Sequence, residues 1–118
     1  MSYKPKVYFT SNVFTPEQIG SNDKIHITIR TIIKNLWTKL ETIAEVKTFK
    51  GRFPTQLELR NEIETFNPEI LGCHISQPIT VELVEDSNIF AIATSTAGYN
   101  HISPLLFENI LITHTPGI

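Results

Sequence analysis

Two polar loops carry the residue types that could do chemistry in this sequence. They are residues 74–80, HISQPIT, and residues 95–102, STAGYNHI, and each follows an apolar, strand-like segment. In open α/β sheets, ligands bind outside the carboxyl ends of the strands, so both loops are expected at one edge of the sheet. His74 would then face the ligand cleft, where its imidazole could contact a polar substrate.

The other segments at that edge argue against three familiar kinds of site. A phosphate-accepting receiver domain needs carboxylates after the first strand and an aspartate after the third, where this chain has Thr10, Ser11, Cys73 and His74. The longest expected loop, residues 10–21, begins TSNVFT and lacks the glycines of a flavodoxin phosphate loop. The five glycines lie far apart, so no GxGxxG turn can hold a dinucleotide. The sequence therefore predicts no cofactor in this chain.

The four histidines do not form an obvious metal site. His26 is expected on a helix surface, His101 in a turn or domain-packing hydrogen bond, and His114 in a structural role. His74, His101 and His114 follow neighbouring strands, but no carboxylate or cysteine completes a ligand set. We therefore predict neither a metal ion nor a catalytic histidine, and keep His74 as a substrate contact.

Five short apolar runs read as strands and alternate with helix-like segments. The third to fifth runs show little polar alternation, which is typical of strands covered on both faces. The alternation implies a parallel sheet with right-handed crossovers. A flavodoxin-like strand order 2-1-3-4-5 is the simplest arrangement with helices on both faces, which makes a three-layer α/β domain. The five runs are residues 6–10 (KVYFT), 45–49 (EVKTF), 69–75 (EILGCHI), 89–94 (IFAIAT) and 110–115 (ILITHT).

Helical patterns fill the gaps between these runs. The longest covers residues 23–44, where apolar residues recur at three- and four-residue steps, as on a helix face packed against a sheet. Thr55 and Glu58 have the spacing of a capping box at the start of a second helix. Short helices are expected from Thr80 and after Ser103. The stripe of the longest helix comprises Ile25, Ile29, Ile32, Ile33, Leu36, Leu40 and Ile43.

Composition describes one ordinary soluble domain and argues against several partners. The 118 residues are 41% hydrophobic and 19% charged, with a net charge of −2, so one domain spanning residues 1–118 is expected. Lys and Arg are scattered singly, which argues against nucleic acid, and no apolar run approaches the ~18 residues that span a membrane. The single cysteine, Cys73, fits a reducing cytoplasm and is expected to be a buried, inert thiol.

The chain resembles a known enzyme family, most specifically in AGYNHI…ILITHTPGI. Together with KPKVYFTSN, PTQLEL and EILGCHISQPITVEL, this segment resembles the substrate-binding domain of the D-isomer specific 2-hydroxyacid dehydrogenases, of the glyoxylate- or hydroxypyruvate-reductase kind. The resemblance implies that the backbone amides of Ala97 and Gly98 hold the substrate carboxylate. It also implies that the loop containing His74 and Ser76 closes one side of the substrate site.

The resemblance further implies a function shared with another domain. The family passes hydride between NAD or NADP and a small 2-oxo or 2-hydroxy acid. Its catalytic His, the carboxylate partner of that His and a substrate-binding Arg lie in sequence beyond Ile118. We therefore expect a fragment or truncated form with no nucleotide-binding domain, no catalytic residue and no turnover alone. An apolar patch left by the missing parts would favour self-association.

Two other functions fit parts of the sequence. A stand-alone flavodoxin-like binding or interaction module without catalysis is suggested by Asn100 and Ser103, where the dehydrogenases usually have Asp. A downstream reading frame with a GxGxxG turn would favour the dehydrogenase fragment, and a natural stop codon would favour the module. A flavin-binding electron carrier is the third alternative, and it would be yellow.

Overall fold

The chain forms one five-stranded parallel sheet in the order β2-β1-β3-β4-β5, which confirms the predicted topology. In this computed structural model, the described residues are 3–13, 15–73, 77–95, 101–106 and 108–113. The strands are β1 Lys6–Phe9, β2 Glu45–Thr48, β3 Ile70–Cys73, β4 Ala91–Thr94 and β5 Leu111–Thr113.

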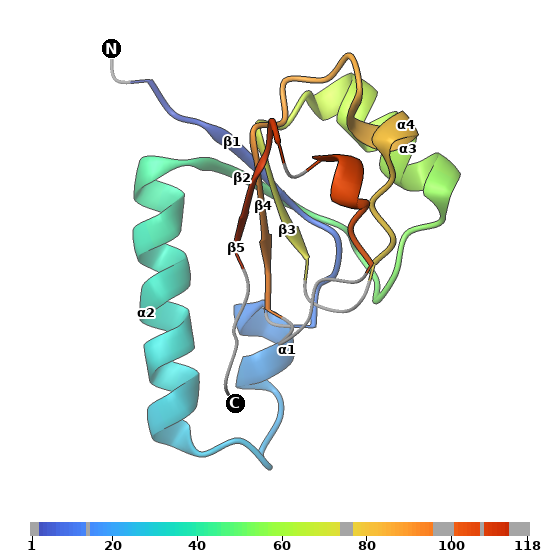
Figure 1. Cartoon of the computed structure of the whole chain (residues 1–118). Helices are drawn as coiled ribbons and strands as arrows, with labels where there is room; N and C mark the ends of the chain where they lie inside the picture. The colour runs from blue at the N-terminus through green and yellow to red at the C-terminus, as the bar shows by residue number, and fades with distance from the viewer. Residues whose placement is uncertain (1–2, 14, 74–76, 96–100, 107, 114–118) are drawn as a thin grey trace.

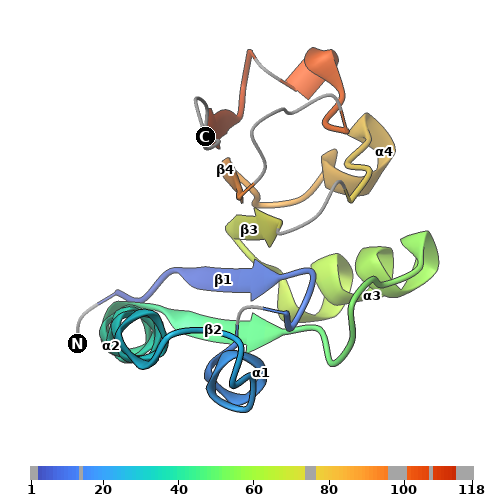
Figure 2. The same cartoon turned by 90° about the horizontal axis from the view of Figure 1, so that it is seen from below.

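Helices lie on both faces of the sheet, so the predicted three-layer α/β class is confirmed (Figure 1). Two helices, α1 and α2, lie on one face, called the α2 face below; the others lie on the opposite, or α3, face (Figure 2). The elements are α1 Pro16–Gly20, α2 Ile27–Ile43, α3 Gln56–Phe66, α4 Val81–Val84 and the 3-10 helix η1 Pro104–Leu106.

Helix α1 lies inside the segment that the sequence predicts as the longest loop. Thr15 is its N-cap, because the Thr15 hydroxyl accepts the Gln18 N–H at 3.4 Å and Pro16 occupies the first helical turn. Ile19 is the buried residue of this helix. The helix was missed because a five-residue turn with one buried residue leaves no periodic pattern to detect.

The hydrophobic core lies on the α3 face. Strand register aligns Tyr8, Leu71, Ile92 and Ile112 in one row across β1, β3, β4 and β5. The first three of these side chains are almost fully buried, and burial raises the pKa of the Tyr8 phenol. Residues from the covering segments complete the cluster, among them Leu59, Ile63, Ile79, Leu83, Val84, Ile102 and Leu106.

Helix α3 begins with the predicted capping box. The Thr55 Oγ1 accepts the Glu58 N–H at 3.1 Å, and the Glu58 Oε1 accepts the Thr55 N–H at 2.9 Å. Both donors would otherwise be unpaired at the helix start. Leu59 and Ile63 are the buried residues of the helix, and Asn67 ends it in the left-handed region at a φ of 56°.

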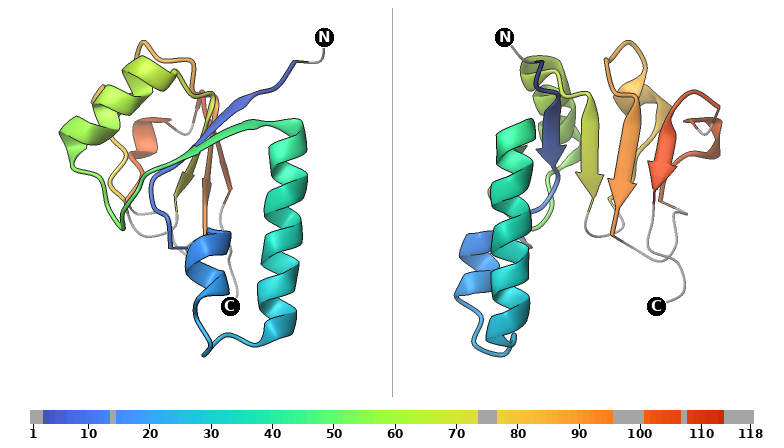
Figure 3. Two further views of the ribbon diagram at one scale, coloured as in Figure 1. Left: turned by 180° about the vertical axis from the view of Figure 1, so that it is seen from behind. Right: turned by 90° about the vertical axis from the view of Figure 1, so that its left-hand side faces the viewer.

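Helix α2 covers only part of the predicted stripe, since Ile33 and Leu40 are half-buried and the other stripe residues within the helix are exposed. None of its 17 residues is buried, and its half-buried apolar side chains are Ile33, Trp37 and Leu40. The Trp37 ring packs on Phe9 of β1, with ring centroids 4.8 Å apart. Most of the predicted stripe faces solvent, because the helix lies over only the β1–β2 side of the sheet (Figure 3). Its exposed apolar residues are Ile27, Ile29, Ile32, Leu36 and Ile43.

The α2 face of β4 and β5 has no described helix over it (Figure 3, right). Leu111 of β5 is 65% exposed, and Ala93 of β4 is also exposed. The prediction that these strands are covered on both faces is therefore wrong within the described part of the chain. An apolar run shows that a strand lacks polar alternation, but it does not show what covers each face. Gly72 of β3 is buried beneath the Phe9 ring.

Candidate functional site

The predicted substrate site falls at the carboxyl ends of β3 and β4. The four residues assigned to it, His74, Ser76, Ala97 and Gly98, lie outside the described residues. His114, expected to be structural, lies outside them too. These five assignments therefore stay predictions, and the site is built from the residues that flank the two loops.

The flanks of the two loops are hydrogen-bonded to each other at both ends. Where the loops begin, the Ser95 N–H donates to the Cys73 carbonyl at 2.9 Å. Where they end, the Ile79 N–H donates to the His101 carbonyl and the Ser103 N–H donates to the Ile79 carbonyl, both at 2.9 Å. The structure therefore brings the described ends of the two predicted loops together.

His101 is tied to the end of β4. Its Nε2 lies 3.3 Å from the Oγ1 of Thr94, a buried residue. Partial burial lowers the pKa of the His101 imidazole below its ordinary value of 6.5, because charging the ring costs more away from water. This contact lies within the domain, so the expectation of a turn or domain-packing hydrogen bond for His101 stays a prediction. His26, expected on a surface, is exposed and accepts the Thr28 N–H at its Nδ1.

Gln77 is a buried acceptor at this edge that the sequence did not single out. Its side chain is 3% exposed, and its Oε1 has no hydrogen-bond partner in the described part of the chain. Leaving a buried polar group unpaired costs about 1–3 kcal/mol. Gln77, which belongs to the loop of residues 74–80, can therefore accept a hydrogen bond there. The only sequence signal was its place in HISQPIT.

The residues at and after the end of β1 make hydrogen bonds that stabilise the fold. The Thr10 N–H donates to the Gly72 carbonyl at 2.9 Å, and the Asn12 N–H donates to the Gly51 carbonyl at 2.9 Å. The Asn12 carbonyl in turn accepts the Thr15 hydroxyl at 2.8 Å. These hydrogen bonds join the segment after β1 to β3 and to the segment after β2.

Cys73 is the buried thiol that the sequence predicts. Burial raises its pKa to about 12, although the Thr10 side chain partly opposes the shift. Since the thiolate is the reactive form, a pKa this high makes the side chain inert near neutral pH. Among the described residues, no three His, Cys, Asp or Glu side chains gather as metal ligands. No described helix is both long and apolar enough to cross a membrane.

A dinucleotide does not fit the described residues. Gly20 ends α1, Gly51 follows β2 and Gly72 lies within β3. A pyrophosphate cradle needs several glycines in the single turn between a strand and a helix N-terminus. None of the described turns between a strand and a helix has that composition. NAD or NADP therefore has no cradle in this part of the chain.

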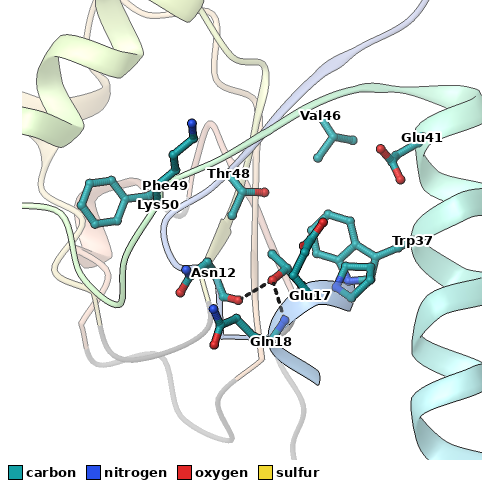
Figure 4. Close-up of a pocket in the computed structure, with 11 residues that line it drawn as sticks. Asn12, Glu17, Gln18, Trp37, Glu41, Val46, Thr48, Phe49 and Lys50 are labelled. Atoms are coloured by element: carbon teal, nitrogen blue, oxygen red, sulfur yellow. Dashed lines mark hydrogen bonds between the residues drawn. The ribbon is translucent and has the colours of Figure 1, made fainter. Parts of the chain in front are cut away.

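A separate pocket lies on the α2 face, beside the ends of β1 and β2. Its volume is about 390 Å³, and α1, α2, β2 and the segments after β1 and β2 line it. Figure 4 shows Glu17 and Glu41 on the same side as Trp37, with Lys50 on the other side. This pocket could not be predicted from the sequence, because its residues come from elements whose packing the sequence pattern does not define. Asn12, Thr15, Pro16, Gln18, Val46, Thr48 and Phe49 complete its lining.

No family model matches the sequence, and no curated protein matches it, but solved structures share its fold. An acyclic imino acid reductase in complex with NADPH and D-Arg matches with a TM-score of 0.63 and 18% identity, over 94% of this chain and 31% of that chain. Apo D-lactate dehydrogenase from Escherichia coli matches with a TM-score of 0.59 and 11% identity, over 96% of this chain and 31% of that chain. The pyruvate reductase of Chlamydomonas reinhardtii matches with a TM-score of 0.58 and 7% identity, over 97% of this chain and 29% of that chain.

These matches confirm the sequence resemblance at the level of the fold. Two of the three structures are a D-lactate dehydrogenase and a pyruvate reductase, the kind of enzyme that the resemblance indicated. The chain spans 29% to 31% of the length of the three structures. It therefore corresponds to a part of each of them.

Proposed function

We propose that residues 1–118 act as the substrate-binding domain of an NAD(P)-dependent D-2-hydroxyacid dehydrogenase, which interconverts small 2-oxo and 2-hydroxy acids. The observation that carries this proposal is the agreement between sequence and fold. AGYNHI…ILITHTPGI resembles that family, and the fold matches a D-lactate dehydrogenase and a pyruvate reductase over nearly the whole chain.

In this proposal, the loops after β3 and β4 bind the substrate. The backbone N–H groups of Ala97 and Gly98 donate to its carboxylate, because two adjacent amides with little side-chain bulk make an anion nest. His74 and Ser76 close the opposite side. Fixing the carboxylate orients C2 of a 2-oxo acid toward a hydride donor. The hydrogen bonds between the flanks of the two loops support this arrangement.

The contribution of this chain is to bind and orient the substrate. The cofactor, NAD or NADP, and the catalytic His, its carboxylate partner and the substrate-binding Arg belong to a nucleotide-binding domain outside these residues. The chain is therefore inactive alone. A cytoplasmic location is part of the proposal, because a reducing compartment suits the free thiol of Cys73.

Two assays on the purified chain test whether it lacks both NADH oxidation and NADH binding. NADH absorbance is followed with glyoxylate or hydroxypyruvate, and NADH fluorescence is followed during titration with the chain. The proposal predicts no oxidation and no saturable fluorescence change. Oxidation of NADH above the rate without protein would contradict it, as would tight NADH binding.

A stand-alone interaction module is the second candidate, and the exposed apolar side chains of α2 favour it. Ile29 and Ile32 are each 49% exposed, and Leu36 is 59% exposed. Such a patch marks an interaction surface in many soluble proteins. Binding of a 2-oxo acid by the two loops would favour the dehydrogenase domain, and a chain that binds none would favour the module.

A further inference from the structure

We propose that the pocket between α1, α2 and β2 binds a small organic cation, a primary ammonium or guanidinium group on a short apolar chain. The inference does not rest on the proposed function. Strands β1 and β3 lie between β2 and β4, so the pocket is about three strand spacings, roughly 14 Å, from the loop after β4. It is therefore a second site, separate from the predicted carboxylate nest.

Two carboxylates give the pocket its charge. Glu17 comes from α1 and Glu41 from α2, and both side chains are exposed. Neither has an ion-pair or hydrogen-bond partner in the described part of the chain. The Lys50 side chain extends away from the Trp37 side in Figure 4, so it does not neutralise them there. A ligand cation would be attracted to both carboxylates.

Trp37 supplies an aromatic wall beside these carboxylates. Its ring packs on Phe9 at 4.8 Å, with 47° between the ring planes, which fixes its position before any ligand arrives. An indole ring is the aromatic side chain that attracts ammonium and guanidinium groups most strongly. Pro16 and Val46 add apolar surface for the chain that carries the cation. Charge and surface therefore favour the same ligand class.

The volume and the polar groups limit the size of that ligand. About 390 Å³ lies at the lower end of the roughly 300–1,000 Å³ found for small-molecule sites. Asn12, Gln18 and Thr48 line the same space and can hydrogen-bond a polar end of the ligand. A small molecule with one cationic end fits this description.

Trp37 makes the test direct, because it is the only tryptophan in the chain. Its fluorescence is followed while n-butylammonium, n-butylguanidinium or butyrate is added at constant ionic strength. The proposal predicts a saturable change with both cations and none with butyrate, which has a similar apolar chain and the opposite charge. No saturable change with either cation would overturn the proposal, as would an equal response to butyrate.

Matched variants assign the response to the pocket. Glu17→Gln and Glu41→Gln keep the side-chain size and each should weaken cation binding about 2- to 5-fold, the range expected for one exposed charge pair. The double variant should weaken it further. Glu85→Gln, at an exposed position on the α3 face, is the control and should leave binding unchanged. Unchanged binding in the double variant would contradict the proposal.

Discussion

One aromatic ring joins the centre of the sheet to α2. The Phe9 ring lies over Gly72 on one side and contacts Trp37 on the other. A Cβ atom added at Gly72 would come within 2.4 Å of the Phe9 ring. The residue type at position 72 is therefore set by this close approach and also affects the position of α2.

Gly72→Ala should destabilise the domain by about 1–3 kcal/mol, because the added methyl group displaces the Phe9 ring from its packed position between Gly72 and Trp37. Urea unfolding measures the loss. Gly20→Ala is the matched control, since nothing lies within 4 Å of the Cβ that it adds. Equal stability of the two variants would show that Phe9 does not lie as described.

Cys73 should be unreactive in the folded chain. With a pKa of about 12, the thiolate fraction at pH 8 is on the order of 10⁻⁴, against about 10⁻¹ for the ordinary value of 9.0. Ellman's reagent should therefore react slowly in buffer and rapidly in urea. A reaction in buffer as fast as that in urea would contradict the burial of this side chain.

The raised pKa of Cys73 also makes the free energy of unfolding depend on pH in alkaline solution. The pKa of Cys73 is raised on folding, so the folded state prefers the neutral thiol. Its contribution to the free energy of unfolding is fully present below pH 9 and is lost as the pH rises toward 12. Cys73→Ser should reduce this alkaline dependence in urea unfolding measured from pH 8 to 11.

The helices show which parts of the fold could be predicted from the sequence. The start of helix α3 was predicted because its capping residues, Thr55 and Glu58, lie three positions apart in one short segment. The strand order was predicted because five apolar runs alternate with helical segments. The buried side of α2 was not, since that depends on how far the helix extends over the sheet. No sequence pattern indicated that Trp37 would contact β1 while Ile32 and Leu36 of the stripe stay exposed.

Thr55→Ala should destabilise α3 by about 1 kcal/mol, because the Glu58 N–H loses its acceptor at the helix start. Thermal unfolding followed by circular dichroism gives the change. Thr65→Ala lies in the same helix, and its hydroxyl donates only to the Asn61 carbonyl one turn earlier. Thr65→Ala should lower the stability less than Thr55→Ala does. A larger loss of stability in Thr65→Ala would argue against the capping box.

The sequence predicted individual substrate contacts, and the described part of the structure does not include the residues that make them. The flanks of the two loops meet as expected, yet the assigned residues Ala97, Gly98, His74 and Ser76 lie outside the described part of the chain. Gln77 was missed, because a single polar residue in a loop does not reveal that its side chain is buried. Burial depends on contacts with segments distant in sequence.

At the scale of the whole molecule, most of the exposed apolar side chains of α2 and Leu111 of β5 form the least covered apolar surface among the described residues. Helix α2 lies on the α2 face of the sheet, and no described helix covers the same face of β5 (Figure 3, right). Apolar surface that remains in water favours association, since burying it releases about 25 cal/mol for each Å². We therefore expect the chain to self-associate through this face.

Sedimentation velocity over a range of concentrations tests this expectation. The sedimentation coefficient of the wild-type chain should rise with concentration, and Leu36→Glu should reduce that rise. Leu57→Glu is the control, because Leu57 is 68% exposed on α3, on the opposite face. A wild-type chain that stays monomeric at all concentrations would contradict the expectation.

The central claim, that this chain binds the acid substrate and not the dinucleotide, is tested most directly by the backbone amide spectrum of the labelled chain. Oxamate, an unreactive analogue of a 2-oxo acid, should shift the N–H signals of Ala97 and Gly98 in a saturable way. Gly98→Val should abolish that shift, Gly20→Ala should keep it, and NADH should shift neither signal. Saturable shifts with NADH, or none at Ala97 and Gly98 with oxamate, would contradict the claim.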